Sequence, residues 1–285
     1  MNLRERQEKL ETILRSATPL LKEGYAAVPG ADPHRAAAIG TKAKSSPKDL
    51  VTEYDRKVER FLFEALNRAF PNEAVIGEEN TAASGKSVRD QAANLDAFWI
   101  VDPIDGTTNY SRAYPFFCST VAYVKKMHEG PHRGSYRPVV AATWDPIHDE
   151  MFAATLGGGA WLNRERLQVT INDNPQQALL TTGFASERAS SGEKSFELFK
   201  ILTKSTLGVR RDGSAALDLA YVAAGRIDAY WEWGLSPWDT AAGILLVQEA
   251  GGRLSHHNGD EIDLMSGEIA ATNGALHDWL LGYLS

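Results

Sequence analysis

The sequence lacks most of the features that would place its 285 residues in a specialised class of protein. Its one cysteine, Cys118, cannot form an internal disulfide, and its apolar neighbours predict a small core residue rather than a nucleophile. No long apolar run follows the N-terminal residues, so we expect neither a signal peptide nor a membrane span, and a cytoplasmic location. Internal repeats and low-complexity linkers are also absent.

Positive charge is scarce as well. Lys and Arg number 30 against 37 Asp and Glu, which gives a net charge of −7. Nucleic-acid-binding proteins usually present a basic face, so we do not expect nucleic acid as the main partner. The hydrophobic content of 43% and charged content of 24% are those of an ordinary globular protein, large enough for one domain or two packed halves.

Two aspartates in the stretch Trp99–Tyr110 are the first candidates for chemistry. The apolar run before them predicts a buried strand that ends on Asp102, with Pro103 fixing a bend and Asp105 following three residues after the first acid. Carboxylates this close repel each other unless a cation lies between them, and Mg²⁺ prefers such oxygen ligands. The simpler alternative is an Asp-Pro turn followed by a helix cap.

An anion site is predicted directly after these acids. Gly106, Thr107 and Thr108 offer successive backbone N–H groups, and the glycine allows an anion to approach closely. A cation on one side and amide donors on the other would together bind phosphate.

Two further motifs accompany this stretch. Gly77-Glu78-Glu79 closes a short apolar run, and Asp239 lies in the run Trp238-Asp239-x-Ala-Ala-Gly243. Together with Asp102 to Thr108, in this order, they resemble the three signature motifs of the inositol monophosphatase family of metal-dependent, lithium-sensitive sugar-phosphate phosphatases. The resemblance extends from about Lys44 to about Asn273.

The resemblance implies an α+β fold, layered as an αβαβα sandwich. The N-terminal half, 1–145, would hold an antiparallel sheet and most metal ligands. The C-terminal half, 146–285, would hold a mixed sheet with helices, the substrate-recognition residues and the last metal ligand. We expect the two halves to pack intimately.

The same resemblance implies two or three Mg²⁺ ions. Their ligands would be the carboxylates of four acids and one main-chain carbonyl: Glu78, Asp102, Asp105, Asp239 and the carbonyl of Ile104. Glu79 is the rival of Glu78 and is assigned to the surroundings of the site. Each acid could otherwise be a surface charge or, for Asp239 above all, a helix cap.

In the family's mechanism a metal-activated water attacks phosphorus in line, and the catalytic residues here would be Thr107, Asp55 and Glu78. Thr107 and Asp55 would help to remove the proton of that water. Thr52 and Asp55 are also spaced like a helix capping box, and the two roles of Asp55 are compatible. The backbone N–H groups of Gly106 and Thr107 would hold phosphate oxygens.

Substrate recognition is assigned to the second half by the same resemblance. Gly213, Ser214, Ala215 and Glu232 match positions at which inositol monophosphatases contact ring hydroxyls, with Asp239 beside them. A carboxylate that accepts two vicinal hydroxyls favours a polyol. Glu232 could instead be a charge at the end of an aromatic strand. Arg210 and Arg211 either steer an anionic substrate or pair with surface acids.

The leading expectation is a Mg²⁺-dependent phosphatase of inositol-1-phosphate that is inhibited by Li⁺ and forms a homodimer without membrane contact. The alternatives are histidinol-phosphate, fructose-1,6-bisphosphate or nucleotide-3′-phosphate as substrate, because such relatives share the metal motifs. An added non-enzymatic role as an RNA-processing or transcription partner is a further alternative.

Local patterns predict most of the elements. We expect an amphipathic helix over 3–26, a mobile loop from Val28 to Gly40, and a helix that ends before Pro71. The segment 28–46 is expected to cover the metal cleft as a lid. Alternating runs from Phe116 to about Val169 predict an antiparallel meander with a hairpin turn at 157–159. The second half should hold helices over 214–224, 239–249 and 275–284, with a strand over 227–231.

Overall fold

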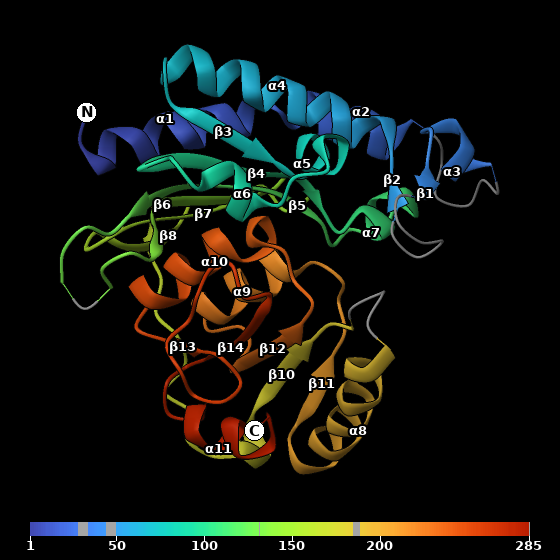
Figure 1. Ribbon diagram of the computed structural model, residues 1–285. Coiled ribbons are helices and arrows are strands. Elements are labelled where there is room, and N and C mark those ends of the chain that lie inside the picture. The colour runs from blue at the N-terminus through green and yellow to red at the C-terminus, as the bar shows by residue number, and fades with distance from the viewer. Residues whose placement is uncertain (28–33, 44–49, 131, 185–188, 285) are drawn as a thin grey trace.

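The computed structural model describes residues 1–27, 34–43, 50–130, 132–184 and 189–284. Five layers are stacked in it: helices, a sheet, helices, a second sheet and a last pair of helices (Figure 1). This arrangement confirms the α+β sandwich expected from the sequence. The first helical layer consists of α1 Leu3–Ser16, α2 Thr18–Ala26 and α4 Glu53–Ala69. The middle layer consists of α9 Ala215–Ala223 and α10 Pro237–Glu249, and the last of α8 Ala189–Ser205 and α11 His277–Leu284.

The first sheet has seven strands in the order of the chain. They are β3 Ala74–Gly77, β4 Ala97–Asp105, β5 Cys118–Lys126, β6 Tyr136–Asp145, β7 Glu150–Thr155, β8 Gly159–Leu162 and β9 Glu165–Arg166. Every neighbouring pair is antiparallel except β3 and β4. The predicted meander and its β7–β8 hairpin are therefore confirmed. The sheet continues beyond residue 145 to Arg166, and the division of the chain at that residue stays a prediction.

The outermost helical layer differs from its prediction, because the single helix expected over 3–26 is wrong. Helix α1 ends at Ser16 and α2 begins at Thr18, with Ala17 between them. Pro19 lies in the first turn of α2, where its missing N–H is tolerated, but it could not continue the hydrogen-bond ladder of α1. The carbonyl of Arg15 instead accepts the Thr18 hydroxyl at 2.6 Å.

Strand β4 also differs from its prediction, since it does not end on Asp102. It runs through Pro103 to Asp105, and its register against β5 shifts between the two aspartates. Proline has no N–H to offer the ladder, so a local irregularity at this place is expected. Strand β5 adapts to it, because the Ser119 hydroxyl bonds the carbonyl of Pro103.

The second sheet is mixed, as predicted. Its order is β11-β10-β12-β14-β13, with β10 parallel to β11 and β12 and the other pairs antiparallel. The strands are β10 Leu179–Thr182, β11 Gly208–Arg210, β12 Ala229–Trp233, β13 Arg253–Ser255 and β14 Glu268–Thr272. The strand predicted over 227–231 thus lies two residues further on, and Asp228 just before it bonds Leu179 through both its backbone N–H and its carboxylate.

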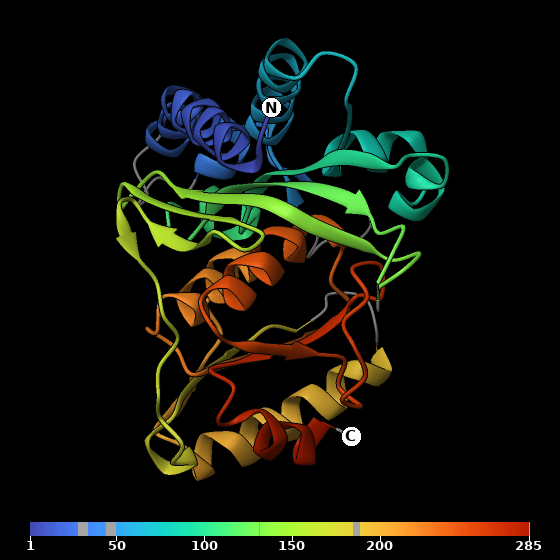
Figure 2. The same ribbon diagram turned by 90° about the vertical axis from the view of Figure 1, so that its left-hand side faces the viewer.

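Helices α9 and α10 form the middle layer and fill the space between the sheets (Figure 2). Eight successive residues of α10, from Thr240 to Val247, are buried, as in a helix surrounded by protein on all sides. Consequently the N-terminal ends of both helices approach the first sheet at fixed positions. None of the helices in the described ranges is long and apolar enough to cross a membrane.

Short elements connect these layers. They are α3 Arg35–Ala38, β1 Lys42–Ala43 paired with β2 Leu50–Val51, α5 Glu78–Ser84, α6 Val88–Ala92, α7 Thr107–Ser111 and a 3₁₀ turn at Pro175–Gln177. The expectation of a loop without helix through Gly40 is wrong at α3. The predicted lid over 28–46 falls partly on residues 28–33 and 44–46, which lie outside the described ranges and include Lys44, so the lid stays a prediction.

Candidate metal and phosphate site

Three carboxylates from both parts of the chain converge at one point. Asp102 and Asp105 come from β4, and Asp239 comes from the first turn of α10. One oxygen from each lies within 4.8 Å of the others, and among the described residues no other group of acids, histidines or cysteines does this. Asp102 is buried and the other two are half-buried. Hard divalent cations bind such a set of oxygens.

Burial and mutual repulsion both act on these acids. Burial raises the pKa of Asp105 to about 6, and the charge of Glu78 adds to the rise. The pKa of Asp239 is raised well above its usual range, first by burial and then by the charges of Asp105 and Glu78. A cation placed among these groups would relieve this cost, so the donor set fits a divalent metal.

Glu78 belongs to the same electrostatic cluster. It is the first residue of α5 and follows β3 directly. Because β3 and β4 are parallel, their carboxyl ends meet at one edge of the sheet, which brings Glu78 beside the two aspartates of β4. The carboxylate of its rival Glu79 lies 4.0 Å from the Arg56 guanidinium.

The carbonyl of Ile104 and the Thr107 hydroxyl lie next to one another. The Thr107 hydroxyl is 3.1 Å from that carbonyl oxygen and 3.0 Å from Oδ1 of Asp55, so its one hydrogen can go to either. Oδ2 of Asp55 accepts the N–H and the hydroxyl of Thr52, which confirms the predicted capping box of α4. Burial is the main cause that raises the pKa of Asp55 to about 7.

The predicted anion site is the start of α7. Gly106 is its N-cap and has φ +93°, a left-handed conformation that other residues rarely adopt. A Cβ on Gly106 would also lie 3.0 Å from the carbonyl oxygen of Phe116. The N–H groups of the first turn follow the acids directly, with Thr107 half-buried and Thr108 exposed.

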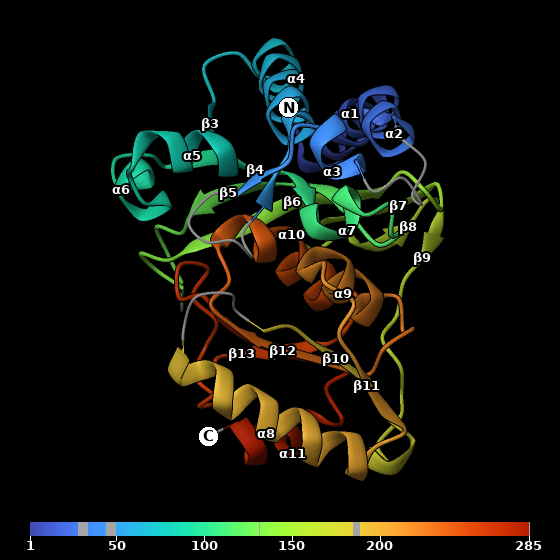
Figure 3. The ribbon, with the colours of Figure 1, turned by 90° about the vertical axis from the view of Figure 1, so that its right-hand side faces the viewer.

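The predicted recognition segment is bonded directly to Asp105 of the first sheet. Oδ2 of Asp105 accepts the Ser214 hydroxyl at 2.7 Å and the N–H of Ala216 at 2.6 Å. Ser214 is the N-cap of α9, and Figure 3 shows α7 close to α9 and α10. Gly213, with φ +89°, lets this turn approach the side chain of Asn109. One carboxylate therefore joins the two parts of the site.

Glu232 faces the same cluster from β12. Burial raises its pKa to about 7, the Tyr230 hydroxyl at 2.6 Å and the Arg211 charge oppose that rise, and Asp105 adds to it. Its carboxylate lies so close to Gly183 that a Cβ there would be 1.9 Å from Oε2.

The expected core role of Cys118 is also confirmed, since the thiol is buried and burial raises its pKa well above the usual value.

Three residues of the site carried no assigned role at the level of sequence. Asn109 donates its amide to the carbonyls of Phe116 and Asp212, at 2.7 and 2.8 Å, and so ties α7 to the recognition segment. Gly183 makes room for Glu232, and Glu59 bonds the start of α5. Of the three, only Glu59 could have been connected with the site from the sequence, because it stands four residues after Asp55 on the same face of a helix.

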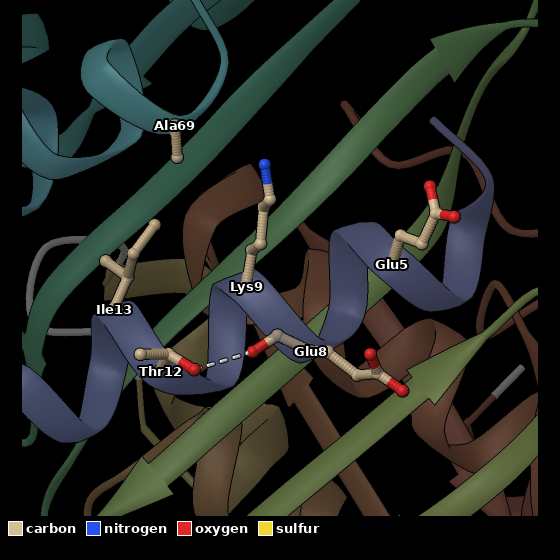
Figure 4. A pocket seen from close by; sticks show the side chains of 6 residues that line it. All are labelled: Glu5, Glu8, Lys9, Thr12, Ile13 and Ala69. Atoms are coloured by element: carbon tan, nitrogen blue, oxygen red, sulfur yellow. Dashed lines mark hydrogen bonds between the residues drawn. The ribbon is translucent and has the colours of Figure 1, made fainter.

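A separate hollow on the outer face of α1 lacks the features of a metal site. Figure 4 shows its lining by Glu5, Glu8, Lys9, Thr12 and Ile13 of α1 and by Ala69 of α4. Its two acids, Glu5 and Glu8, lie beside Lys9 on an exposed helix face and do not form a metal-binding group. This hollow has no counterpart of the three-carboxylate cluster.

A layered α+β fold in which three carboxylates from a strand and a helix converge beside the start of another helix fits the class of metal-dependent phosphatases. Within that class the chain belongs to the inositol monophosphatase family, whose sequence model matches residues 6–285. The protein is accordingly a phosphatase.

Individual relatives agree with this placement. An inositol-1-monophosphatase of Synechocystis is 40% identical over 239 residues, which cover 83% of this chain and 77% of the relative. The Nus factor SuhB of Pseudomonas aeruginosa is 42% identical over 228 residues, 79% of each chain. The structure of inositol monophosphatase from Anabaena superimposes with a TM-score of 0.80 at 35% identity, covering 100% of this chain and 96% of that one.

Proposed function

We propose that this phosphatase hydrolyses inositol-1-phosphate to inositol and phosphate, by in-line attack of water on phosphorus, with two or three Mg²⁺ ions. The observation that carries the proposal is the convergence of Asp102, Asp105 and Asp239 within 4.8 Å, directly beside the start of α7. Glu78 and the carbonyl of Ile104 complete the proposed ligand set.

Bound Mg²⁺ supplies Lewis acidity, which makes water a better nucleophile and stabilises the leaving oxygen. The chain itself supplies position and proton transfer. N–H groups of Gly106 and Thr107 hold the phosphate oxygens. The Thr107 hydroxyl can accept a hydrogen bond from the attacking water while it donates its own hydrogen to Asp55, 3.0 Å away.

Recognition of the alcohol falls to the second half. Glu232 faces the acid cluster from β12, so its carboxylate can accept hydroxyls of a polyol whose phosphate lies at the metal ligands. The turn at Gly213, Ser214 and Ala215 is held against Asp105 by the Ser214 hydroxyl and is proposed to contact the same polyol. Histidinol-phosphate, fructose-1,6-bisphosphate and nucleotide-3′-phosphate are the competing substrates.

The 42% identity to a Nus factor favours a second function, a non-enzymatic role as a partner in RNA processing or transcription. We propose it as an addition to catalysis, because the acidic groups expected of the phosphatase are all present. The net charge of −7 favours a protein partner over direct contact with RNA. The family resemblance also leads us to propose a homodimer in the cytoplasm, which size-exclusion chromatography and cell fractionation can test.

The experiment is phosphate release from the four classes of substrate, with and without Mg²⁺. We expect activity only with Mg²⁺, the highest kcat/KM for inositol-1-phosphate, and inhibition by Li⁺ when Mg²⁺ is limiting. Turnover that ignores Mg²⁺ would contradict the metal site, whereas a preference for another phosphate ester would contradict only the proposed substrate.

A further inference from the structure

Glu59 lies on α4 within the site, but it is not among the residues proposed to bind the metal or the phosphate. It stands one turn after Asp55, and residues four apart share one face of a helix. Asp55 bonds Thr107 of the phosphate loop, whereas Glu59 points to a different segment. Its side chain is buried, with 6% of the residue exposed.

The segment that Glu59 contacts is the start of α5, which carries Glu78. Its two carboxylate oxygens accept the backbone N–H groups of Glu79, at 2.8 Å, and Asn80, at 2.9 Å. The first turn of a helix leaves such N–H groups without partners inside the helix. The N-cap of α5 is Gly77, which has no side chain to accept them, so a residue of α4 caps the helix instead.

Gly77 is explained by the same contact. Its φ of −125° is open to any residue, so conformation does not demand glycine here. Space does: a Cβ on Gly77 would lie 2.3 Å from Oε2 of Glu59 and 2.7 Å from the Phe63 ring. The glycine that precedes Glu78 in the family motif is thus the space that the Glu59 carboxylate needs.

We propose that Glu59 is a positioning residue that fixes the turn Gly77–Glu79 and thereby holds the Glu78 carboxylate in register with Asp102, Asp105 and Asp239. Helix α4 then aligns two parts of the site at once, Thr107 through Asp55 and Glu78 through Glu59. The claim that Glu59 strengthens Mg²⁺ binding rests on the proposed function. The claim that it fixes the backbone of the turn rests on the two hydrogen bonds alone.

A matched control separates positioning from general stability. Glu73 is also a partly buried acid beside β3, and it accepts the Arg6 guanidinium and the Trp99 indole N–H at 2.7 to 2.8 Å. It makes these contacts away from the acid cluster. Both Glu59→Gln and Glu73→Gln should lower the melting temperature, but only the first should disturb the turn that carries Glu78.

The test combines two measurements on wild type, Glu59→Gln and Glu73→Gln: Mg²⁺ affinity by isothermal titration calorimetry, and hydrogen exchange of the peptide covering residues 77–84 without metal. For Glu59→Gln we expect a Kd for Mg²⁺ that is about tenfold or more weaker, as is typical when a group that orients a ligand is lost. Exchange of that peptide should also be faster. Glu73→Gln should leave both close to wild type.

Unchanged affinity and exchange in folded Glu59→Gln would overturn the proposal, as would an equal loss of Mg²⁺ affinity in Glu73→Gln. If Glu59→Gln does not fold, Gly77→Ala displaces the same carboxylate and should give the same pair of effects. If wild type binds no Mg²⁺, the proposed function fails by itself. The exchange of the turn then decides the remaining claim, with slow exchange in Glu59→Gln counting against it.

Discussion

The two regions that build the site differ in how their residues are held. On the first sheet, Asp102, Ile104, Asp105 and Thr107 lie within six residues of β4 and α7, so the local backbone places them. In the second half, Ser214, Glu232 and Asp239 come from three separate elements, a helix start, a strand and another helix start. The local backbone therefore sets the positions of the first group relative to one another, whereas the second group comes together only through the fold.

The contacts between these regions indicate a division of labour. Asp105 belongs to the first region, yet its Oδ2 accepts both the Ser214 hydroxyl and the N–H of Ala216. Asp239 crosses in the other direction and completes the carboxylate cluster. We infer that the first region performs the chemistry common to all phosphate monoesters, and that the second aligns the alcohol.

The largest effect is expected from a change in the first region. Asp102→Asn keeps the volume of the side chain and removes a ligand charge, so kcat/KM should fall about a thousandfold or more for every substrate. Phosphate release from inositol-1-phosphate and glycerol-2-phosphate measures this. The control is Asp149→Asn, an exposed acid that pairs with Arg15. Near-normal turnover of folded Asp102→Asn would place the metal elsewhere.

A smaller loss, again equal for both substrates, is expected at Thr107. Thr107→Ala removes the hydroxyl that Asp55 holds but keeps the backbone N–H of the phosphate loop. Loss of a proton-transfer group typically costs about a hundredfold, so kcat should fall by about that factor with little change in KM. A selective loss for inositol-1-phosphate would assign Thr107 to recognition and blur the comparison between regions.

The smallest effect concerns stability in the second half, away from the site. Burial lowers the pKa of His277 from 6.5 to about 4, and its ring nitrogens lie 2.8 and 3.1 Å from the hydroxyls of Ser255 and Thr272. As the pH falls through 6.5 the unfolded chain takes up a proton that the folded protein refuses until about pH 4. Stability is therefore lost across this interval as the pH falls.

Between pH 7 and pH 5 this histidine should lower the free energy of unfolding by about 2 kcal/mol. Urea unfolding of wild type and His277→Asn at both pH values gives the difference, since other titrating groups cancel. The variant should lose that much less on acidification and keep its activity at pH 7. Identical pH dependence in the two proteins would refute the assignment.

Local capping signals were predicted more accurately than the ends of the strands around the site. The capping box of Thr52 and Asp55 depends on neighbours in the sequence, which is why it was predictable, whereas the helix expected from Asp239 begins two residues earlier, at Pro237. The end of β4 was not predictable, because the strand continues past Pro103 with help from the Ser119 hydroxyl of the adjacent strand. That partner is chosen by tertiary structure.

Glu59 shows the same limit within the site. Its spacing from Asp55 was visible, but nothing in the sequence says that its carboxylate caps a helix which begins some twenty residues later. The break between α1 and α2 is a different case. Pro19 is a helix-breaking residue, but the prediction followed the apolar periodicity across 3–26 instead. The proline was the more accurate signal there.

The division between the two regions is tested most directly by one ratio: kcat/KM for inositol-1-phosphate over that for glycerol-2-phosphate, in wild type and Glu232→Gln. Glutamine keeps the size of the side chain and loses the charged acceptor, whose hydrogen bonds are worth about 1.5–3 kcal/mol. We predict a ten- to hundredfold loss for inositol-1-phosphate, about the factor that this energy gives, and much less for the small ester. An equal loss on both substrates, or no loss on either, would contradict the account that the second region reads the alcohol.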